Sequence, residues 1–348
     1  MILTDLALVL LVVGGWFAAR FAGDLFSEKE YIVVSEVRTE PEKETASPPP
    51  VAPAAAAEEP APETEEPAPE EPRTEWQIRF AEHFTPETGE TEDTYSSPNL
   101  SVRITHHTIG EDKEQITYHL ADIYMGCVDC FRAGLAKTPP RFHMSASLLG
   151  MMETNDAVVA VNGDFCGFSF GGTVVRNGVV YSSGDSGVDL CVLYRDGRME
   201  THCSGEFKLD QAIEEDVFQV WSFGPALLEA DGSPRDIPWP SIPNVHISGR
   251  NPRTAIGYFE PGHYCFLVVD GRQIGYSRGA TLEEMSQIFS ELGCRAAFNL
   301  DGGGSSMMGF QGRLVSQVPS LAPRNLSDCL YIADIAPSGA EQEAADGT

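Results

Sequence analysis

Three aspartates in this sequence end apolar runs and stand beside glycines. They occur in "AVVAVNGDF" (Asp164), "YCFLVVDGR" (Asp270) and "CRAAFNLDGGGSSMM" (Asp301). Asp and Gly are common turn formers, so a single junction of this kind needs no chemistry to explain it. Three consecutive glycines are costly to order, and they suit a backbone that takes positive φ or is approached closely by a ligand. Hydroxyls follow at Ser305 and Ser306, and hydroxyls beside exposed N–H groups can form a nest for an anion such as phosphate.

The segment between Asp270 and Asp301 predicts how these residues are positioned. In "TLEEMSQIFSELG", Thr281 and Glu284 form a capping box and Gly293 supplies a C-terminal stop. Apolar runs precede and follow this helix, which suggests a βαβ unit with parallel strands. The predicted fold class is therefore α+β: a mixed central β-sheet with at least one parallel βαβ unit, flanked by helices, in a single globular domain. Parallel strands would bring both aspartates to one edge of the sheet.

Other elements are expected on either side of the first aspartate. Residues 100–110 and 115–125 alternate in the manner of half-buried strands, and residues 145–154 read as a helix. "GTVVRNGVVYSS" has Asn177 and Gly178 between two alternating runs, which is a strong hairpin signal. We assign that turn no chemistry.

The first 75 residues have a different composition from the rest. Residues 1–26 hold an apolar segment that is about long enough to cross a bilayer. It lacks a basic residue before the apolar core and a clean small-x-small site after it, so we favour an uncleaved membrane anchor over a cleaved signal peptide. Residues 27–75 are predicted to be a disordered stalk rich in Pro, Glu and Ala. A globular domain is predicted for 76–336 and a disordered tail for 337–348, with the domain held outside the cytoplasm, or secreted if the segment is cleaved.

Charge and cysteine content restrict the partners. The 348 residues carry a formal charge of −29, which argues against nucleic acid, because phosphate backbones are bound through a surplus of Lys and Arg. Eight cysteines all follow the stalk, and an even number in an exported protein favours at least one disulfide. "CVDC" (Cys127 and Cys130) suits a local disulfide, with buried thiols as the alternative. Zinc is disfavoured because no second C-x-x-C or H-x-x-x-H motif occurs.

Several blocks together resemble the phosphodiester glycosidase family. They are "VAVNGDFCGF", "GRNPRTAIGYF", "VVDGRQIGYSRGATLEEMSQIFSELG" and "AFNLDGGGSSMM", and the likeness covers roughly residues 156–332. The closing "APRNLSDCLYI" agrees only in part, because Arg324 fits but Asp328 and Cys329 stand where the family usually has Asn and Ala. Bacterial members of the family are often associated with exopolysaccharide. The resemblance implies catalytic residues Asp301, Asp164 and Asp270, and it implies substrate contacts from Asn162, Arg253, Thr254, Arg272, Ser277, Asn299, Gly302, Gly303, Gly304 and Ser305.

This resemblance and the aspartate cluster point to the same chemistry. Cleaving a sugar-1-phosphodiester passes through an oxocarbenium-like state that carboxylates stabilise, and the phosphate leaving group needs Arg and N–H donors. The predicted function is hydrolysis of sugar-1-phosphodiester linkages, of the α-GlcNAc-1-phosphate type, in cell-surface glycopolymers. The alternatives are a non-catalytic wall-binding module and a polysaccharide-assembly protein on the same fold. No cofactor is required, although an aspartate cluster could recruit calcium through oxygen ligands.

Overall fold

The computed structural model describes residues 73–138, 144–166, 172–185, 187–237, 249–319 and 322–337, and also the short strand β1 (Ile32–Val33). The predicted anchor, nearly all of the stalk and most of the predicted tail lie outside these residues. Within the described ranges, no helix is long and apolar enough to span a bilayer. The predicted domain boundaries stay a prediction.

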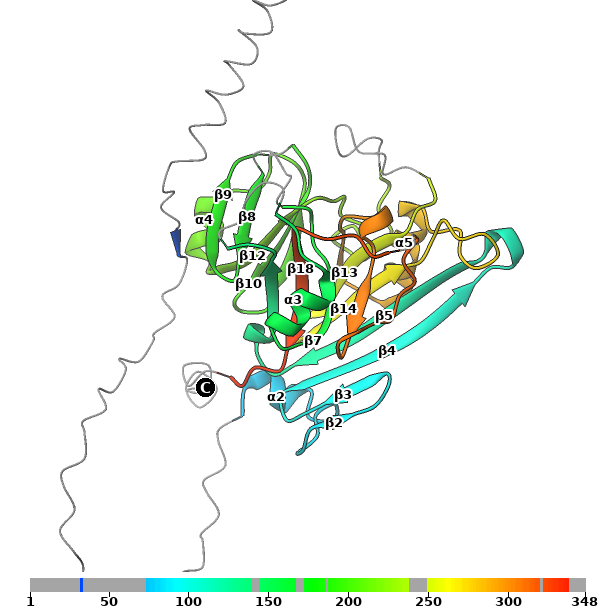
Figure 1. The fold of residues 1–348 in the computed structure, drawn as a ribbon. Helices are drawn as coiled ribbons and strands as arrows, with labels where there is room; N and C mark the ends of the chain where they lie inside the picture. Colours follow the sequence, from blue (N-terminus) through cyan, green and yellow to red (C-terminus); the bar gives the residue numbers. More distant parts are fainter. Residues whose placement is uncertain are drawn as a thin grey trace, which may run out of the picture. The chain divides into compact units, whose positions relative to one another are not determined.

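The largest sheet has seven strands in the order β15-β13-β14-β5-β4-β3-β2, and its paired strands are antiparallel. Figure 1 shows β4 and β5 as a long ribbon that extends beyond the neighbouring strands. The short helix α2 (Glu75–Arg79) precedes this sheet in the chain. The strands are β2 (Gly89–Glu90), β3 (Thr94–Ser96), β4 (Leu100–Ile109), β5 (Ile116–Met125), β13 (Arg253–Glu260), β14 (His263–Val269) and β15 (Ala296–Asn299).

Two further sheets are also built from antiparallel pairs. The five-stranded sheet has the order β17-β16-β7-β18-β6, and the six-stranded sheet has the order β1-β9-β8-β12-β10-β11. The five-stranded sheet contains β6 (Phe131–Leu135), β7 (Ala157–Asn162), β16 (Met308–Phe310), β17 (Arg313–Leu314) and β18 (Asp328–Ala333). Besides β1, the six-stranded sheet contains β8 (Thr173–Arg176), β9 (Val179–Ser183), β10 (Leu190–Tyr194), β11 (Met199–His202) and β12 (Val217–Ser222).

The predicted α+β class with a parallel βαβ unit is wrong, because the chain is predominantly β and its described strand pairs are antiparallel. Helix α5 (Leu282–Leu292) does connect β14 to β15, but β13 lies between these two strands and pairs with both of them antiparallel. The strand–helix–strand pattern does not reveal whether an earlier strand inserts between the two. Strands β14 and β15 still run in the same direction, so Asp270 and Asp301 follow strand ends at one edge of the sheet for a different reason from the predicted one.

Local signals were read more accurately than the topology. Thr281 and Glu284 form the capping box of α5, and Gly293 ends that helix with φ of 84°. The turn between β8 and β9 is at Asn177 and Gly178, both with positive φ, as predicted. The predicted helix at 145–154 is present but shorter: α3 (Leu148–Thr154) begins after Ser147, whose side chain accepts from the N–H of Gly150. Within the described ranges, the remaining helical segments are α4 (Leu209–Glu214) and the single turns η1 (Asp112–Glu114), η2 (Val128–Cys130) and η3 (Gly303–Ser305).

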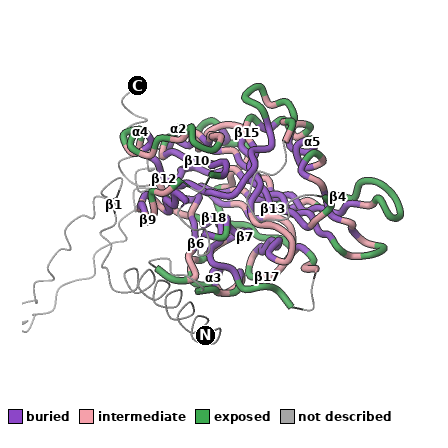
Figure 2. Tube along the Cα trace, turned by 90° about the horizontal axis from the view of Figure 1, so that it is seen from above, coloured by how far each residue is buried: buried purple, intermediate pink, exposed green. Residues whose placement is uncertain are grey.

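The main apolar core is shared among the sheets. Its buried side chains include those of β4, β5, β13 and β14 of the seven-stranded sheet, β7 and β18 of the five-stranded sheet, β10 and β12 of the six-stranded sheet, and helix α5. Figure 2 shows continuous buried stretches through β7, β13 and β18, while the turn beyond β4 is exposed. Because the core spans all three sheets, burial of apolar area holds the strand ends of different sheets at fixed positions.

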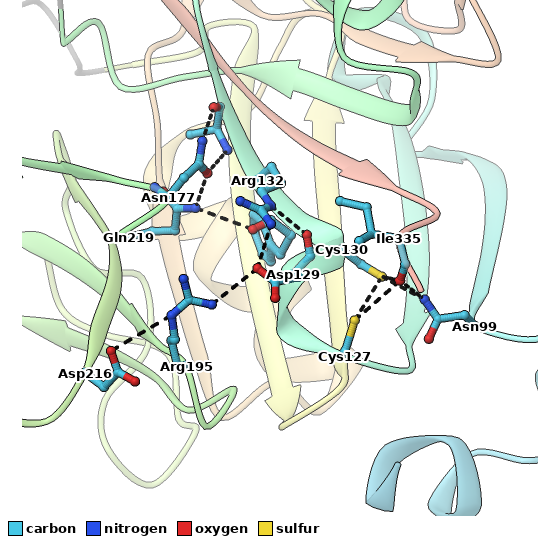
Figure 3. A network of polar contacts seen from close by, with 12 residues as sticks. Asn99, Cys127, Asp129, Cys130, Arg132, Asn177, Arg195, Asp216, Gln219 and Ile335 are labelled. Carbon is cyan, nitrogen blue, oxygen red and sulfur yellow. Dashed lines mark hydrogen bonds and ion pairs between the residues drawn. The ribbon is translucent and has the colours of Figure 1, made fainter. Parts of the chain in front are cut away.

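Polar contacts join the five-stranded sheet to the hairpin of the six-stranded sheet (Figure 3). Asn177 exchanges two hydrogen bonds with the main chain of Ala133, and Nε2 of Gln219 donates to the Asn177 side chain at 2.7 Å. Nearby, Arg132 donates to the carboxylate of Asp129 at 2.6 Å. The hairpin turn is thereby fixed against β6, together with the residue that precedes the turn, Arg176.

The eight cysteines all lie in the described residues, and they are present as thiols. Two pairs are close: Sγ of Cys127 and Sγ of Cys130 are 3.8 Å apart, and Sγ of Cys265 and Sγ of Cys294 are 4.0 Å apart. The predicted disulfide is therefore not supported by this structure.

Candidate active site

The segment after β15 forms a loop, residues 301–305, which we call the glycine loop. Gly303 has φ of 66°, in the left-handed region. A Cβ at Gly303 would lie 3.1 Å from Nη2 of Arg272, and a Cβ at Gly304 would lie 3.0 Å from Nη2 of Arg324. Glycine suits these positions because two guanidinium groups lie against the backbone.

These two arginines bring positive charge to the loop. Arg272 is exposed and donates to Oδ1 of Asn251 at 2.7 Å, while Arg324 is exposed and donates to Oγ of Ser305 at 3.3 Å. Within the part of the chain that the structure describes, neither guanidinium lies within ion-pair distance of a carboxylate. Two arginines beside the same loop can bind a phosphate through charge-assisted hydrogen bonds.

Asp301 begins the glycine loop, and its carboxyl group has several donors. Its Oδ1 accepts from the N–H of Gly302 at 2.8 Å, and the hydroxyl of Ser305 also donates to this carboxyl. Burial raises the pKa of Asp301, and the negative charge of Asp328 adds to this rise. The two hydrogen bonds and the charge of Arg324 act in the opposite direction. Asp301 therefore retains a proton to higher pH than an exposed aspartate, which suits a group that exchanges protons during a reaction.

A pocket opens beside the glycine loop. It comprises about 250 Å³ of space, part of which is open solvent. Its lining combines carboxylates, a cation, a hydroxyl and apolar side chains, and it includes Asp301, Asp328, Arg324, Ser305, Phe165 and Leu326. This mixture fits a ligand that has an anionic group at one end and an apolar surface elsewhere.

Asn162, which lines this pocket, and Thr254 are hydrogen-bonded to each other beneath it. Oδ1 of Asn162 accepts from the hydroxyl of Thr254 at 2.6 Å, and Nδ2 of Asn162 donates to the carbonyl of Asp301 at 2.7 Å. Both side chains are fully buried. Both were predicted to contact substrate, and the contacts described here instead join the end of β7 to β13 and hold the main chain of Asp301.

Asp164 belongs to a buried cluster rather than to the pocket lining. Nη2 of Arg176 donates to Asp164 at 2.6 Å and to Asp328 at 3.3 Å, and the N–H of Ser222 donates to Asp164 at 2.7 Å. Burial raises the pKa of Asp164 to about 7; Arg176 acts against this rise, and the second carboxylate adds to it. A Cβ at Gly163 would lie 2.1 Å from Oδ2 of Asp328, so glycine is needed where this carboxylate packs.

Asp270 lies away from the pocket lining, although it follows a strand end at the same sheet edge as Asp301. Its Oδ2 accepts from Nε2 of His119 and from the hydroxyl of Tyr276, both at 2.8 Å. Its Oδ1 accepts from the N–H of Gln317 at 3.0 Å. Protein donors thus reach both oxygens, and this carboxylate holds three segments of the chain together.

Three other predicted contacts are also buried within the protein. Arg253 donates to the carbonyls of Ala280 and Gly249, and burial lowers its pKa to about 10, with Arg272 adding to the lowering. Ser277 donates to the main-chain carbonyl of Asp270 at 2.6 Å.

Asn299 donates to the carbonyl of Gly224 at 2.8 Å, and its Oδ1 is buried without a hydrogen bond in the structure. The predicted site residues therefore divide by exposure. Arg272 is exposed, and Asp301 and the three glycines that follow it are partly exposed. Asn162 and Ser305 are buried but line the pocket, and the other predicted residues are buried inside the protein.

Comparison with protein families decides what this chain is related to. Residues 155–333, more than half of the 348 residues, match the family model described as phosphodiester glycosidase. The chain belongs to the phosphodiester glycosidase family. The resemblance inferred from the sequence blocks is confirmed, and the matched region contains the glycine loop, Arg272, Arg324 and the pocket.

Two relatives show how far the likeness extends. A 195-residue segment is 30% identical to the SPbeta prophage-derived uncharacterized protein YomE of Bacillus subtilis (strain 168), and it covers 54% of this chain and 29% of that protein. The chain thus spans less than a third of the length of this relative. The catalytic domain of zebrafish N-acetylglucosamine-1-phosphodiester alpha-N-acetylglucosaminidase, auto-inhibited by its pro-peptide, has the same fold: the TM-score is 0.55 and the identity 21%, over 72% of this chain and 88% of that chain.

The aspartates expected to recruit calcium, Asp164, Asp270 and Asp301, are not brought together as a group of ligands in the described residues, and the group found there does not suit calcium. Ligand atoms of Asp164, Cys166 and Asp328 lie within 4.8 Å of one another, and all three residues are buried. Calcium takes six to eight oxygen ligands, whereas this group offers a thiol and two carboxylates that already bind a guanidinium. We therefore derive no step through calcium.

Three residues at or behind the pocket were missed by sequence reasoning. Arg176 was overlooked because it lies beside a hairpin turn, although a charged residue in an apolar strand could have drawn attention. Asp328 was noticed only as a departure from the family pattern. Phe165 ends the segment "AVVAVNGDF" and was assigned no role, because no pattern in the sequence shows that its ring is exposed.

Proposed function

We propose that this chain hydrolyses the bond between the anomeric carbon of a sugar and the phosphate of a phosphodiester. One arrangement carries the proposal: Asp301 begins a glycine loop whose backbone packs against Arg272 and Arg324, at the edge of a pocket. Membership of the phosphodiester glycosidase family supports it. So does the fold shared with a zebrafish enzyme whose name states activity on N-acetylglucosamine-1-phosphodiesters.

Residues at the glycine loop divide the chemistry between them. Arg272 and Arg324 hold the phosphate and stabilise the charge that it gains as the C–O bond breaks. The carboxyl group of Asp301 faces the sugar, where it stabilises the positive charge developing at the anomeric carbon and takes a proton from the attacking water. The products are a free sugar and a phosphate monoester.

The finer parts of the proposal concern the natural substrate and its place in the cell. The apolar segment in residues 1–26 and the Pro- and Glu-rich composition of residues 27–75 favour a domain tethered outside the cytoplasm. We therefore propose sugar-1-phosphodiester linkages of cell-surface glycopolymers, including exopolysaccharides, as the substrate class, with the membrane contacted through the N-terminal segment.

The test uses methyl α-GlcNAc-1-phosphate and related glycosyl diesters in water enriched with ¹⁸O. The expected result is release of reducing sugar with the label on the sugar, because the C–O bond breaks. A label on the phosphate would show P–O cleavage and would refute a glycosidase. Binding of the diester without turnover would favour the non-catalytic wall-binding alternative.

A further inference from the structure

Phe165 is an exposed aromatic side chain at the pocket. It is 39% exposed, whereas its neighbours Asp164 and Cys166 are buried at 1% and 8%. Four other large apolar side chains in the described ranges are exposed, namely Ile78, Ile109, Met144 and Ile274, and Phe165 is the aromatic one among them. It also lines the pocket, together with Asp301 and Arg324.

The backbone of Phe165 is held in a conformation that such a residue rarely takes. Its φ is 69°, in the left-handed region, where a bulky side chain is strained. The preceding carboxylate of Asp164 is bonded to Arg176 and to the N–H of Ser222, which fixes the chain immediately before the ring. Strain of this kind persists where surrounding contacts enforce it, and it is concentrated at functional sites.

We propose that Phe165 is the sugar-binding platform of the pocket, on which the apolar face of a pyranose ring stacks while the phosphate lies against Arg324 and the glycine loop. This inference rests on the proposed function and deepens it, because it specifies a cyclic sugar rather than an open-chain alcohol at the anomeric side. An aromatic face also attracts positive charge, so the ring favours the oxocarbenium-like state. Asp164 then acts as a positioning residue, which holds Phe165 through the main chain.

The variant Phe165→Gly separates binding from folding. Glycine tolerates positive φ, so the melting temperature should be unchanged or higher. Loss of the ring should raise KM for methyl α-GlcNAc-1-phosphate on the order of tenfold, the scale of one desolvated aromatic contact. The inhibition constant of inorganic phosphate should stay within twofold of the wild type. Phe165→Trp should retain the wild-type KM, and Ile78→Ala, which removes an exposed apolar side chain on α2, should change neither constant.

Measuring ligand binding directly, without turnover, tests this inference separately from the proposed function. Calorimetry with α-GlcNAc-1-phosphate and with inorganic phosphate should show that the wild type prefers the sugar phosphate and that Phe165→Gly loses the preference. That result without turnover would support the platform and refute the hydrolase. Turnover in which Phe165→Gly keeps the wild-type KM would refute the platform and leave the hydrolase intact. A fall in melting temperature for Phe165→Gly would also refute it, since the ring would then be a packing residue.

Discussion

Replacing single glycines of the glycine loop by alanine tests most directly whether Arg272 and Arg324 bind phosphate against this loop, an arrangement that we call the phosphate cradle. Gly303→Ala puts a Cβ at φ of 66° and 3.1 Å from the guanidinium of Arg272. Gly304→Ala puts a Cβ 3.0 Å from the guanidinium of Arg324, at a residue without positive φ. The two substitutions should therefore displace different arginines, and only the first should also strain the backbone.

The expected magnitudes follow from these contacts. Alanine in the left-handed region costs about 1–2 kcal/mol. At about 2–4 °C per kcal/mol for a domain of this size, Gly303→Ala should lower the melting temperature by roughly 2–8 °C. A guanidinium is the flexible end of a side chain and can move aside, so Gly304→Ala should melt close to the wild type. Loss of one charge-assisted hydrogen bond to the phosphate costs about 1.5–3 kcal/mol, so kcat/KM should fall roughly 10- to 150-fold in both variants.

The assay combines thermal melting with kcat/KM for a glycosyl phosphodiester. Gly205→Ala is the matched control, since Gly205 has φ of 81° and nothing lies within 4 Å of the position that its new Cβ would take. It should reproduce the loss of stability and leave kcat/KM unchanged. The cradle would be refuted if Gly304→Ala kept wild-type kcat/KM, or if Gly303→Ala lost no more activity than this control.

Three further predictions concern charge and domain organisation. Asp301→Asn should lower kcat on the order of a hundredfold or more. Because burial raises the pKa of Asp301, its ionised form destabilises the fold, and stability is lost as pH rises through that pKa. This variant should therefore also melt above the wild type at neutral pH. Arg176→Met should cost about 3–5 kcal/mol in urea unfolding at neutral pH, because two buried carboxylates lose their partner. The difference from wild type should shrink at low pH, because burial raises the pKa of Asp164 to about 7 and its carboxylate takes up a proton there. A difference independent of pH would contradict the shared ion pair. A chain that begins at Arg73 should melt cooperatively and keep its activity, and loss of folding on this truncation would show that the preceding residues dock on the domain.

Short-range features of this protein could be predicted from the sequence. The capping box of α5, the stop at Gly293 and the hairpin turn at Asn177 depend on contacts between residues a few positions apart, and the structure has all three. The family could be recognised because the "NLDGGGSS" and "VDGR" blocks are specific. The glycine loop was identified as a site of close approach for the same reason: consecutive glycines are conformationally costly wherever they occur.

The tertiary structure decided the sheet topology and the roles of the aspartates. Strand β13 inserts between β14 and β15, so strands expected to pair as parallel neighbours lie apart. Asp164 and Asp270 each follow an apolar strand, as Asp301 does, but their partners are Arg176 and His119, which are 12 and 151 residues away in sequence.

The sequence by itself determined which local turns and caps form and which residues flank the glycine loop in the chain, because these depend on neighbouring residues. The fold decided which carboxylates are held by internal partners and which face the pocket. It likewise decided that Phe165 is exposed while the residues on either side are buried. The physical reason is that the availability of a side chain depends on burial and on donors brought from distant segments, and neither is encoded in the residues that adjoin it.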